Sequence, residues 1–270
     1  MIKVTTLGTG VCSSHYDLNV DSLRKPPGFL IDCDGYRILL DCSQDIAARL
    51  ENRGIPLESI NVIAISHAHP DHNALIHFIQ SVYAKGLWGG EKMETLSVIM
   101  PNHLIDNFAT WWKIYIPETD TFDFPTLTFH RPNETYSIHG VNGEITIEAF
   151  AVYHGFGKTE SYAFRISYDK KVISYSGDTG VCYGVIDAAR YANLFICEAS
   201  ARIGDNENGF NYGHLNPQQA GSLAKDAETK KLFLTHYTGL DSPDRMISDC
   251  RSSEYKGDLV IGYDHYNETF

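Results

Sequence analysis

The sequence predicts an α/β protein in which two β-sheets pack against each other and helices cover the outside. Strand signals alternate with helix signals along all 270 residues, and no low-complexity segment or charge block marks a linker. Strand pairs and single strand–helix units occur in both halves of the chain. We therefore expect one domain over residues 1–270, since a single α/β domain of this length is common.

The first half of the chain begins with strands. Residues 1–8 are typical of a strand that enters a glycine turn, and residues 28–42 of a hairpin whose turn is Asp34-Gly35. Residues 44–53 follow as a helix that ends at a glycine. Residues 61–66, NVIAIS, form a short apolar strand of the buried type.

The second half repeats this style. Asn142-Gly143 is a hairpin turn between two alternating runs. Residues 161–167 pair with residues 171–176 across a turn at 168–170, and two further buried strands follow, at 194–197 and 231–235.

The last two helices have clear N-terminal signals. Asn216 is a good helix cap, with Pro217 at the first helical position and Gln219 at the third. Ser242-Pro243 is the same combination of cap residue and proline ahead of the final helix. A strand at 258–262 follows that helix.

The stretch 85–125 is the least regular part of the sequence. It contains the three tryptophans and Tyr115. We interpret it as an insertion or a lid beside a functional site. Packing in the core is the more common role of such a tryptophan pair as Trp111-Trp112.

The charge balance excludes one broad function. The chain has 22 basic and 34 acidic residues, which gives a formal net charge of −12. An acidic chain repels phosphate backbones, so we do not expect a protein that coats nucleic acid. Metal ions held at one local site could still bind a single phosphate.

Cysteine use and hydropathy bear on the compartment. None of the six cysteines lies in a CxxC pair, and most sit in apolar runs, as expected of buried thiols in a reducing cytosol. We therefore expect a cytoplasmic protein. No apolar run approaches the ~18 residues of a membrane helix, so we expect no membrane partner.

The dominant chemical signal is the segment 67–72, HAHPDH, directly after the NVIAIS strand. In an extended segment His67 and His69 point to the same side. Asp71 and His72 begin the next predicted helix and can turn back to the same place. Imidazoles and a carboxylate that converge at a strand end favour zinc or a similar divalent ion. The alternative is a polar loop with incidental histidines, but such groups are costly to bring together without a cation.

Three later residues of metal-binding type also end apolar strands. His154, Asp178 and His236 each lie where a buried strand meets a loop, the usual place for a site. Taken singly, a histidine at a strand end is more often an ordinary polar residue. Together with the HAHPDH segment, they provide enough groups for two ions.

This ordered set resembles the metallo-β-lactamase superfamily, whose HxHxDH motif and three later single ligands occur in the same order. The resemblance covers nearly the whole chain and implies a four-layer αβ/βα sandwich, with two divalent metal ions at one edge between the sheets. Zinc is the default, and manganese or iron fit the same ligands. The family pattern divides the ligands as follows: His67, His69 and His154 for one ion, Asp71, His72 and His236 for the other, and Asp178 between them.

A narrower resemblance rests on residues 213–216, GHLN, and on residues 234–237, LTHY, which are similar to ribonuclease Z and its shorter bacterial and archaeal relatives. It implies that His214 lies beside the metals and assists departure of the leaving group. Residues 196–199, ICEA, resemble the strand before this motif, and Glu198 is a candidate for orienting a metal ligand.

The sequence departs from the members that process transfer RNA. Those members carry a Pro/Lys/Arg/Asn-rich turn where residues 11–19 have no Lys or Arg, and no Lys-rich arm for gripping transfer RNA is evident. We therefore expect a phosphodiesterase whose substrate is a small phosphodiester or a short single-stranded nucleic acid. The resemblance also implies a homodimer.

The expected mechanism uses a hydroxide that bridges two ions ~3.5–4 Å apart as the nucleophile. Asp71 binds metal and accepts a hydrogen bond from the nucleophile, and protonated His214 donates to the leaving oxygen. Two alternatives stay open. One is a hydrolase of a thioester, lactone or sulfate ester, and the other is a non-catalytic metal-binding protein, because the fold alone does not choose between them.

Overall fold

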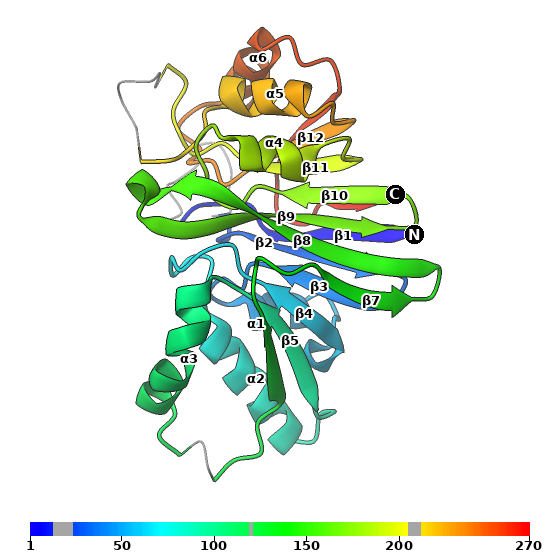
Figure 1. The fold of residues 1–270 in the computed structure, drawn as a ribbon, viewed down its shortest axis with the longest axis vertical. Helices are drawn as coiled ribbons and strands as arrows, with labels where there is room; N and C mark the ends of the chain where they lie inside the picture. The colour runs from blue at the N-terminus through cyan, green and yellow to red at the C-terminus, as the bar shows by residue number, and fades with distance from the viewer. Residues whose placement is uncertain (13–23, 119–120, 205–211) are drawn as a thin grey trace.

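The structure, a computed structural model, describes residues 1–12, 24–118, 121–204 and 212–270. Its strands form two seven-stranded sheets (Figure 1). The first sheet contains, in spatial order, β14 (Asn267–Thr269), β1 (Ile2–Gly8), β2 (Gly28–Cys33), β3 (Tyr36–Leu40), β4 (Ile60–Ala64), β5 (Thr95–Ile99) and β6 (Thr126–His130). The second contains β13 (Asp258–Ile261), β12 (Lys231–Thr235), β11 (Leu194–Glu198), β10 (Lys171–Tyr175), β9 (Thr159–Tyr168), β8 (Gly143–His154) and β7 (Tyr136–Gly140).

The helices lie outside the two sheets. One set, α1 (Ile46–Glu51), α2 (Leu75–Leu87) and α3 (Asn102–Tyr115), packs on the first sheet. The other set, α4 (Tyr183–Ala189), α5 (Pro217–Asp226) and α6 (Pro243–Ser252), packs on the second. Two short 3-10 turns complete the described elements: η1 (Leu57–Ser59) and η2 (Gly155–Gly157).

Three clusters of buried apolar side chains fill the spaces between these layers. The central cluster joins the two sheets and contains buried side chains from both, such as Ile31 and Phe164. The outer clusters join each sheet to its own helices. Figure 1 shows the resulting order of helices, sheet, sheet and helices, so the predicted four-layer αβ/βα sandwich is confirmed.

Each sheet contains a run of parallel strands. In the first sheet β3, β4, β5 and β6 are parallel neighbours, and in the second so are β10, β11, β12 and β13. Parallel strands bring their carboxyl ends to one edge, where ligand sites form. The loops after β4, β10, β11 and β12 all start there.

The hairpins predicted from turn residues are present, but the turn predicted at Asn142-Gly143 lies one residue earlier, at 141–142, because Gly140 pairs with Gly143. Asp34 and Gly35 both have positive φ, 51° and 96°, as a two-residue hairpin turn requires. The turn between β9 and β10 is one residue shorter than expected, because Tyr168 pairs with Lys171 across the two strands.

The predicted helix starts are also confirmed. Asn216 Oδ1 accepts from the Gln219 amide at 2.9 Å, and Gln219 Oε1 accepts from the Asn216 amide at 3.0 Å. This reciprocal cap fixes the start of α5 three residues after His214. Ser242 Oγ accepts from the amide of Arg245 at the start of α6.

The stretch 85–125 contributes to the first sheet as well as to its surface. β5 lies between β4 and β6, and α3 buries Leu104 and Phe108 against the outer core. Trp112 packs on Phe108, with ring centroids 5.7 Å apart. Residues 13–19 of the arginine-free stretch lie outside the described residues.

Two further expectations concern cysteines and membranes. Four of the cysteines, Cys33, Cys42, Cys197 and Cys250, are buried free thiols, whereas Cys12 is exposed. None of the described helices is both long enough and apolar enough to span a bilayer.

Candidate metal centre

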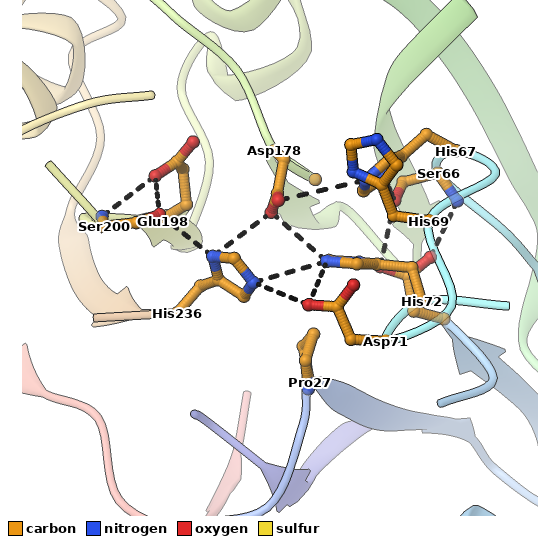
Figure 2. A network of polar contacts seen from close by, with 12 residues as sticks. Pro27, Ser66, His67, His69, Asp71, His72, Asp178, Glu198, Ser200 and His236 are labelled. Atoms are coloured by element: carbon orange, nitrogen blue, oxygen red, sulfur yellow. Dashed lines mark hydrogen bonds and ion pairs between the residues drawn. The ribbon is translucent and has the colours of Figure 1, made fainter. Parts of the chain in front are cut away.

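The predicted ligands converge at the carboxyl edge of the strands. His67, His69, Asp71 and His72 lie in the loop between β4 and α2. The others come from the second sheet: His154 ends β8, Asp178 follows β10 and His236 follows β12. Figure 2 shows Asp178 between His67 and His236, with His72 and Asp71 facing it from the first sheet.

One group of ligand atoms belongs to His67, His69, His154 and Asp178. One ligand atom from each of these side chains lies within 4.8 Å of the others. His154 Nε2 is 3.2 Å from His69 Nδ1, and His67 Nε2 is 3.9 Å from Asp178 Oδ2. This group corresponds to the first predicted ion together with its bridging aspartate.

A second group belongs to Asp71, His72 and His236. His236 Nε2 lies 3.4 Å from His72 Nε2 and 3.4 Å from Asp71 Oδ2, and Asp178 Oδ1 lies 3.4 Å from His72 Nε2. A tetrahedral ion with bonds of about 2.1 Å separates neighbouring ligand atoms by about 3.4 Å. These separations therefore suit a divalent ion at the centre.

Two polar atoms in the cluster have no hydrogen-bond partner among the described residues. They are His67 Nε2 and Asp178 Oδ1, and both are buried. A buried polar atom without a partner costs free energy, because it has lost its contact with water. A cation bound between them supplies the missing contact, so the residues present fit divalent metal ions.

Hydrogen bonds behind the rings orient the histidines of both groups. Nδ1 of His72 donates to Asp41 Oδ2 at 2.6 Å, and Nδ1 of His154 donates to the Gly213 carbonyl at 2.9 Å. His67 Nδ1 lies 3.0 Å from Ser66 Oγ, which itself donates to Asp41. With the proton held on Nδ1, each Nε2 offers a lone pair toward the cluster.

A hydrogen bond at Nδ1 also orients His236, which belongs to the second sheet's side of the site. Its Nδ1 lies 2.9 Å from Ser200 Oγ, which donates to Glu198 Oε2 at 2.6 Å (Figure 2). The Ser200 hydroxyl therefore accepts from His236 and leaves Nε2 free to face Asp71 and His72. His236 has a φ of 52°, a left-handed backbone conformation that is uncommon outside glycine.

The buried carboxylates of the cluster give it a negative charge that favours binding of a cation. Burial lowers the pKa of His67 and His154, which keeps both rings neutral. Burial acts in the same direction on His72, but the Asp178 and Asp41 carboxylates outweigh it and raise the pKa of His72 well above its usual value. Without a metal ion, a proton on His72 supplies the positive charge between the carboxylates.

His214 lies beside the two groups and pairs with a carboxylate. Its Nδ1 is 2.8 Å from Glu198 Oε1, a carboxylate that is fully buried and also accepts from the Thr179 amide. Burial lowers the pKa of His214, but Glu198 outweighs it and raises the pKa to about 9. The ring of Tyr212 stacks on His214 with centroids 5.6 Å apart.

His214 also belongs to a third possible group of ligands, with Asp178 and His236. In that group Nε2 is the only ring nitrogen left for a metal, because Nδ1 is bonded to Glu198. His214 therefore has two possible roles, as a proton donor beside the ions or as a ligand, and these differ in what its removal does to the metal content.

A sequence model of the β-lactamase superfamily domain matches residues 36–237, about three quarters of the chain. The chain belongs to the β-lactamase superfamily. The match contains every predicted ligand and His214, so all the site residues lie inside the superfamily domain.

Relatives within the superfamily carry the name ribonuclease Z. The chain is 26% identical to ribonuclease Z of Saccharolobus solfataricus, in an alignment that covers 87% of this chain and 88% of the relative. It is 28% identical to ribonuclease Z of Saccharolobus islandicus over the same shares of the two chains. Both alignments span most of each protein.

Solved structures of the superfamily share the fold. YhfI of Bacillus subtilis, a metallo-β-lactamase fold protein, is 22% identical, with a TM-score of 0.74 and full coverage of both chains. The short form of human tRNase Z is 19% identical, with a TM-score of 0.74 and coverage of 99% and 98%. At these identities the likeness shows the fold.

One prediction about this superfamily motif is wrong. Asp71 and His72 do not begin α2, which starts at Leu75. The reason is a pair of backbone bonds from the first sheet: the Cys42 amide donates to the His72 carbonyl, and the Ala74 amide donates to the Cys42 carbonyl. They keep the backbone out of helical conformation up to Ala74. The His72 amide donates to the His69 carbonyl, and this turn directs His72 back to the site.

Asp41 is the residue that the sequence analysis missed. It is fully buried, and it accepts from the Ser66 amide at 2.7 Å and from the Tyr175 hydroxyl at 2.6 Å as well as from His72. It directly follows the apolar strand β3, the same feature that identified Asp178. That signal could have identified it.

Proposed function

We propose that this protein is a dinuclear metal-dependent hydrolase of phosphodiesters, similar to ribonuclease Z. The observation that carries the proposal is that Asp178 belongs to the first group of ligand atoms and lies 3.4 Å from His72 of the second, with the His214–Glu198 pair beside them. Two divalent ions suit phosphoryl chemistry because they stabilise both the attacking and the leaving oxygen. A donor next to them assists departure of the leaving group.

These contacts support a role for each residue of the site. When bound, divalent ions would supply positive charge to the phosphoryl oxygens and would lower the pKa of a bound water molecule. His67, His69 and His154 would hold one ion, Asp71, His72 and His236 would hold the other, and Asp178 would serve both. Asp71 also accepts a hydrogen bond from the attacking water. His214 is held by Glu198 at Nδ1, so its Nε2 donates to the leaving oxygen.

Finer assignments rest on the resemblance and on ordinary chemistry. Mixed imidazole and carboxylate ligands suit zinc best, with manganese or iron as alternatives. The substrate is a small phosphodiester or a short single-stranded nucleic acid, the protein is a homodimer, and it works in the cytoplasm. We treat residues 1–270 as one hydrolase domain.

We propose that α3 acts as a lid or side wall of the site. It lines a cavity of about 410 Å³ together with the start of α2 and with Ala68, which lies between the ligands His67 and His69. Trp111 and Tyr115 face this cavity from α3. A helix in this position can cover part of a bound substrate.

The test is hydrolysis of bis(p-nitrophenyl) phosphate by protein loaded with zinc or manganese. We expect turnover that requires metal. The variant His214→Ala is expected to lose about 10²–10⁴-fold in turnover while it keeps both ions, because it loses only a proton donor. Loss of metal from this variant would make His214 a ligand. A protein that holds two ions without turnover would direct the search to thioesters, lactones or sulfate esters.

A further inference from the structure

We propose that a cationic cavity beside the metal centre binds a second phosphate of the substrate, next to the one that is hydrolysed. This inference rests on the proposed function and narrows its substrate to an oligonucleotide with at least two phosphates. The cavity has a volume of about 710 Å³, and its lining includes Arg24, Lys25, Arg49, Arg53, Tyr237 and Asp264.

The charge of this cavity is opposite to that of the whole chain. Four basic side chains line it in a protein whose net charge is −12. Among its described lining residues the one carboxylate is Asp264, whose oxygens accept from the Thr9 hydroxyl and from the Lys25 amide. Lys25, Arg49 and Arg53 form no ion pair within 4.0 Å in the described part of the chain, and Asp264 acts on Arg49 and Arg53 from beyond that distance, in the direction that raises their pKa.

Arg49 makes the wall of the cavity permanently positive. Its side chain is 8% exposed, and it donates to the carbonyl groups of Leu7 and Pro26 at 3.0 and 2.7 Å. Its Nε is buried and has no partner among the described residues. Burial lowers its pKa to about 10, so the guanidinium stays charged at neutral pH. A buried cation without a carboxylate partner favours binding of an anion.

The cavity contains the residue that directly follows the predicted metal ligand His236. The amide of His236 donates to the Thr9 carbonyl at 2.9 Å, and Arg24 Nη1 donates to the same oxygen at 3.1 Å. The next residue, Tyr237, lines the cavity, and the guanidinium of Arg24 lies 3.4 Å from its ring centroid. One carbonyl oxygen therefore separates the metal-binding loop from the first cation of the cavity.

A nucleic-acid strand has the chemistry that fits this arrangement. It presents one negative charge per nucleotide, and guanidinium and ammonium groups are the usual partners of phosphate. With one phosphodiester at the metal centre, the proposal places the neighbouring phosphate in this cavity. A substrate with a single phosphate leaves the cavity unused, so the cavity favours short single strands over small phosphodiesters.

The experiment compares the dinucleotide TpT with pTpT and TpTp, which carry an additional phosphate at one end. We expect metal-loaded wild-type protein to have a kcat/KM about tenfold higher for one of the phosphorylated forms than for TpT. One additional charge-assisted hydrogen bond accounts for a difference of this size. The variants Arg53→Gln and Lys25→Gln should reduce this ratio several-fold. Lys230→Gln removes one exposed charge at the opposite end of β12 and should keep the ratio.

A second readout separates this inference from the proposed function. Equilibrium binding of the same dinucleotides to chelator-treated protein does not depend on turnover. Stronger binding of a phosphorylated form that Arg53→Gln abolishes supports the cavity even when no dinucleotide is hydrolysed. Equal binding and equal kcat/KM for TpT and its phosphorylated forms overturn the inference, and so does a preference that Arg53→Gln and Lys25→Gln leave intact.

Discussion

Asp41 and His72 illustrate how the reactive side chains depend on residues that do not face the substrate. Asp41 accepts from His72, Ser66 and Tyr175 in a fully buried position. It sets the His72 tautomer directly and that of His67 through the Ser66 hydroxyl. Both groups of ligands therefore contain a histidine whose lone pair depends on one carboxylate.

Asp41→Asn is expected to weaken metal binding about 10–100-fold, the usual effect of removing a partner that orients a ligand. The amide has one acceptor oxygen where the carboxylate uses two. Competition with a fluorescent chelator measures the change. Tyr175→Phe is the matched control, since it removes one donor to Asp41 and keeps the carboxylate. Unchanged metal affinity in Asp41→Asn would refute the orienting role.

At the scale of elements, one carboxylate links the second sheet to α3. Glu160 lies on β9, and its Oε1 accepts from the Asn102 amide at 2.9 Å while its Oε2 lies 2.8 Å from His103 Nδ1. Negative charge at a helix N-terminus is favourable because of the helix dipole. Glu160 therefore fixes the start of the helix proposed as a lid, although 57 or more residues separate the two in sequence.

Glu160→Gln is expected to lower the melting temperature by about 2–4 °C at pH 7, since a cap contributes about 1 kcal/mol. Burial raises the pKa of Glu160, but the hydrogen bonds from His103 and Asn102 outweigh it and lower the pKa to about 2. A lowered pKa means that the stabilisation is complete above the ordinary value of 4.5 and is lost as the pH falls toward 2. Thermal unfolding of both proteins across this range measures it. If the difference in melting temperature between wild type and Glu160→Gln stays constant from pH 7 to pH 2, the Glu160 carboxylate does not stabilise the start of α3.

Sequence patterns predict local features of this protein well and long-range ones poorly. The HAHPDH segment, the strand-end residues His154, Asp178 and His236, and the cap at Asn216 each depend on a few neighbouring residues. The contact of Glu160 with α3 does not, because nothing near Glu160 in the sequence indicates its partner. The cationic cavity was missed for the same reason: nothing near Arg49 and Arg53, which come from one segment, indicates that Lys25 lies beside them.

At the scale of the whole molecule, the metal centre joins the two halves of the sandwich. The ligands in the 67–72 segment follow the first sheet, whereas His154, Asp178 and His236 belong to the second. Ions that bind both sets hold the sheets together at this edge. Ligands that bind only the folded state stabilise it according to their concentration and affinity.

Removal of the metal is therefore expected to lower the melting temperature. With free metal at 100 times its dissociation constant the stabilisation is about 2.7 kcal/mol, or about 5–10 °C for a chain of this size. Calorimetry before and after treatment with a chelator measures the shift, and adding the ion back should restore it. If the chelator removes both ions without changing the melting temperature, the centre does not link the sheets.

The most direct measurement of the central claim is a metal titration. Chelator-treated protein receives increasing amounts of zinc or manganese while bound ions and hydrolysis of bis(p-nitrophenyl) phosphate are recorded together. The account predicts that turnover rises until two ions are bound per chain, and that Asp178→Ala binds neither ion tightly. Full turnover with one bound ion, or two bound ions in Asp178→Ala, would contradict a dinuclear phosphodiesterase bridged by Asp178.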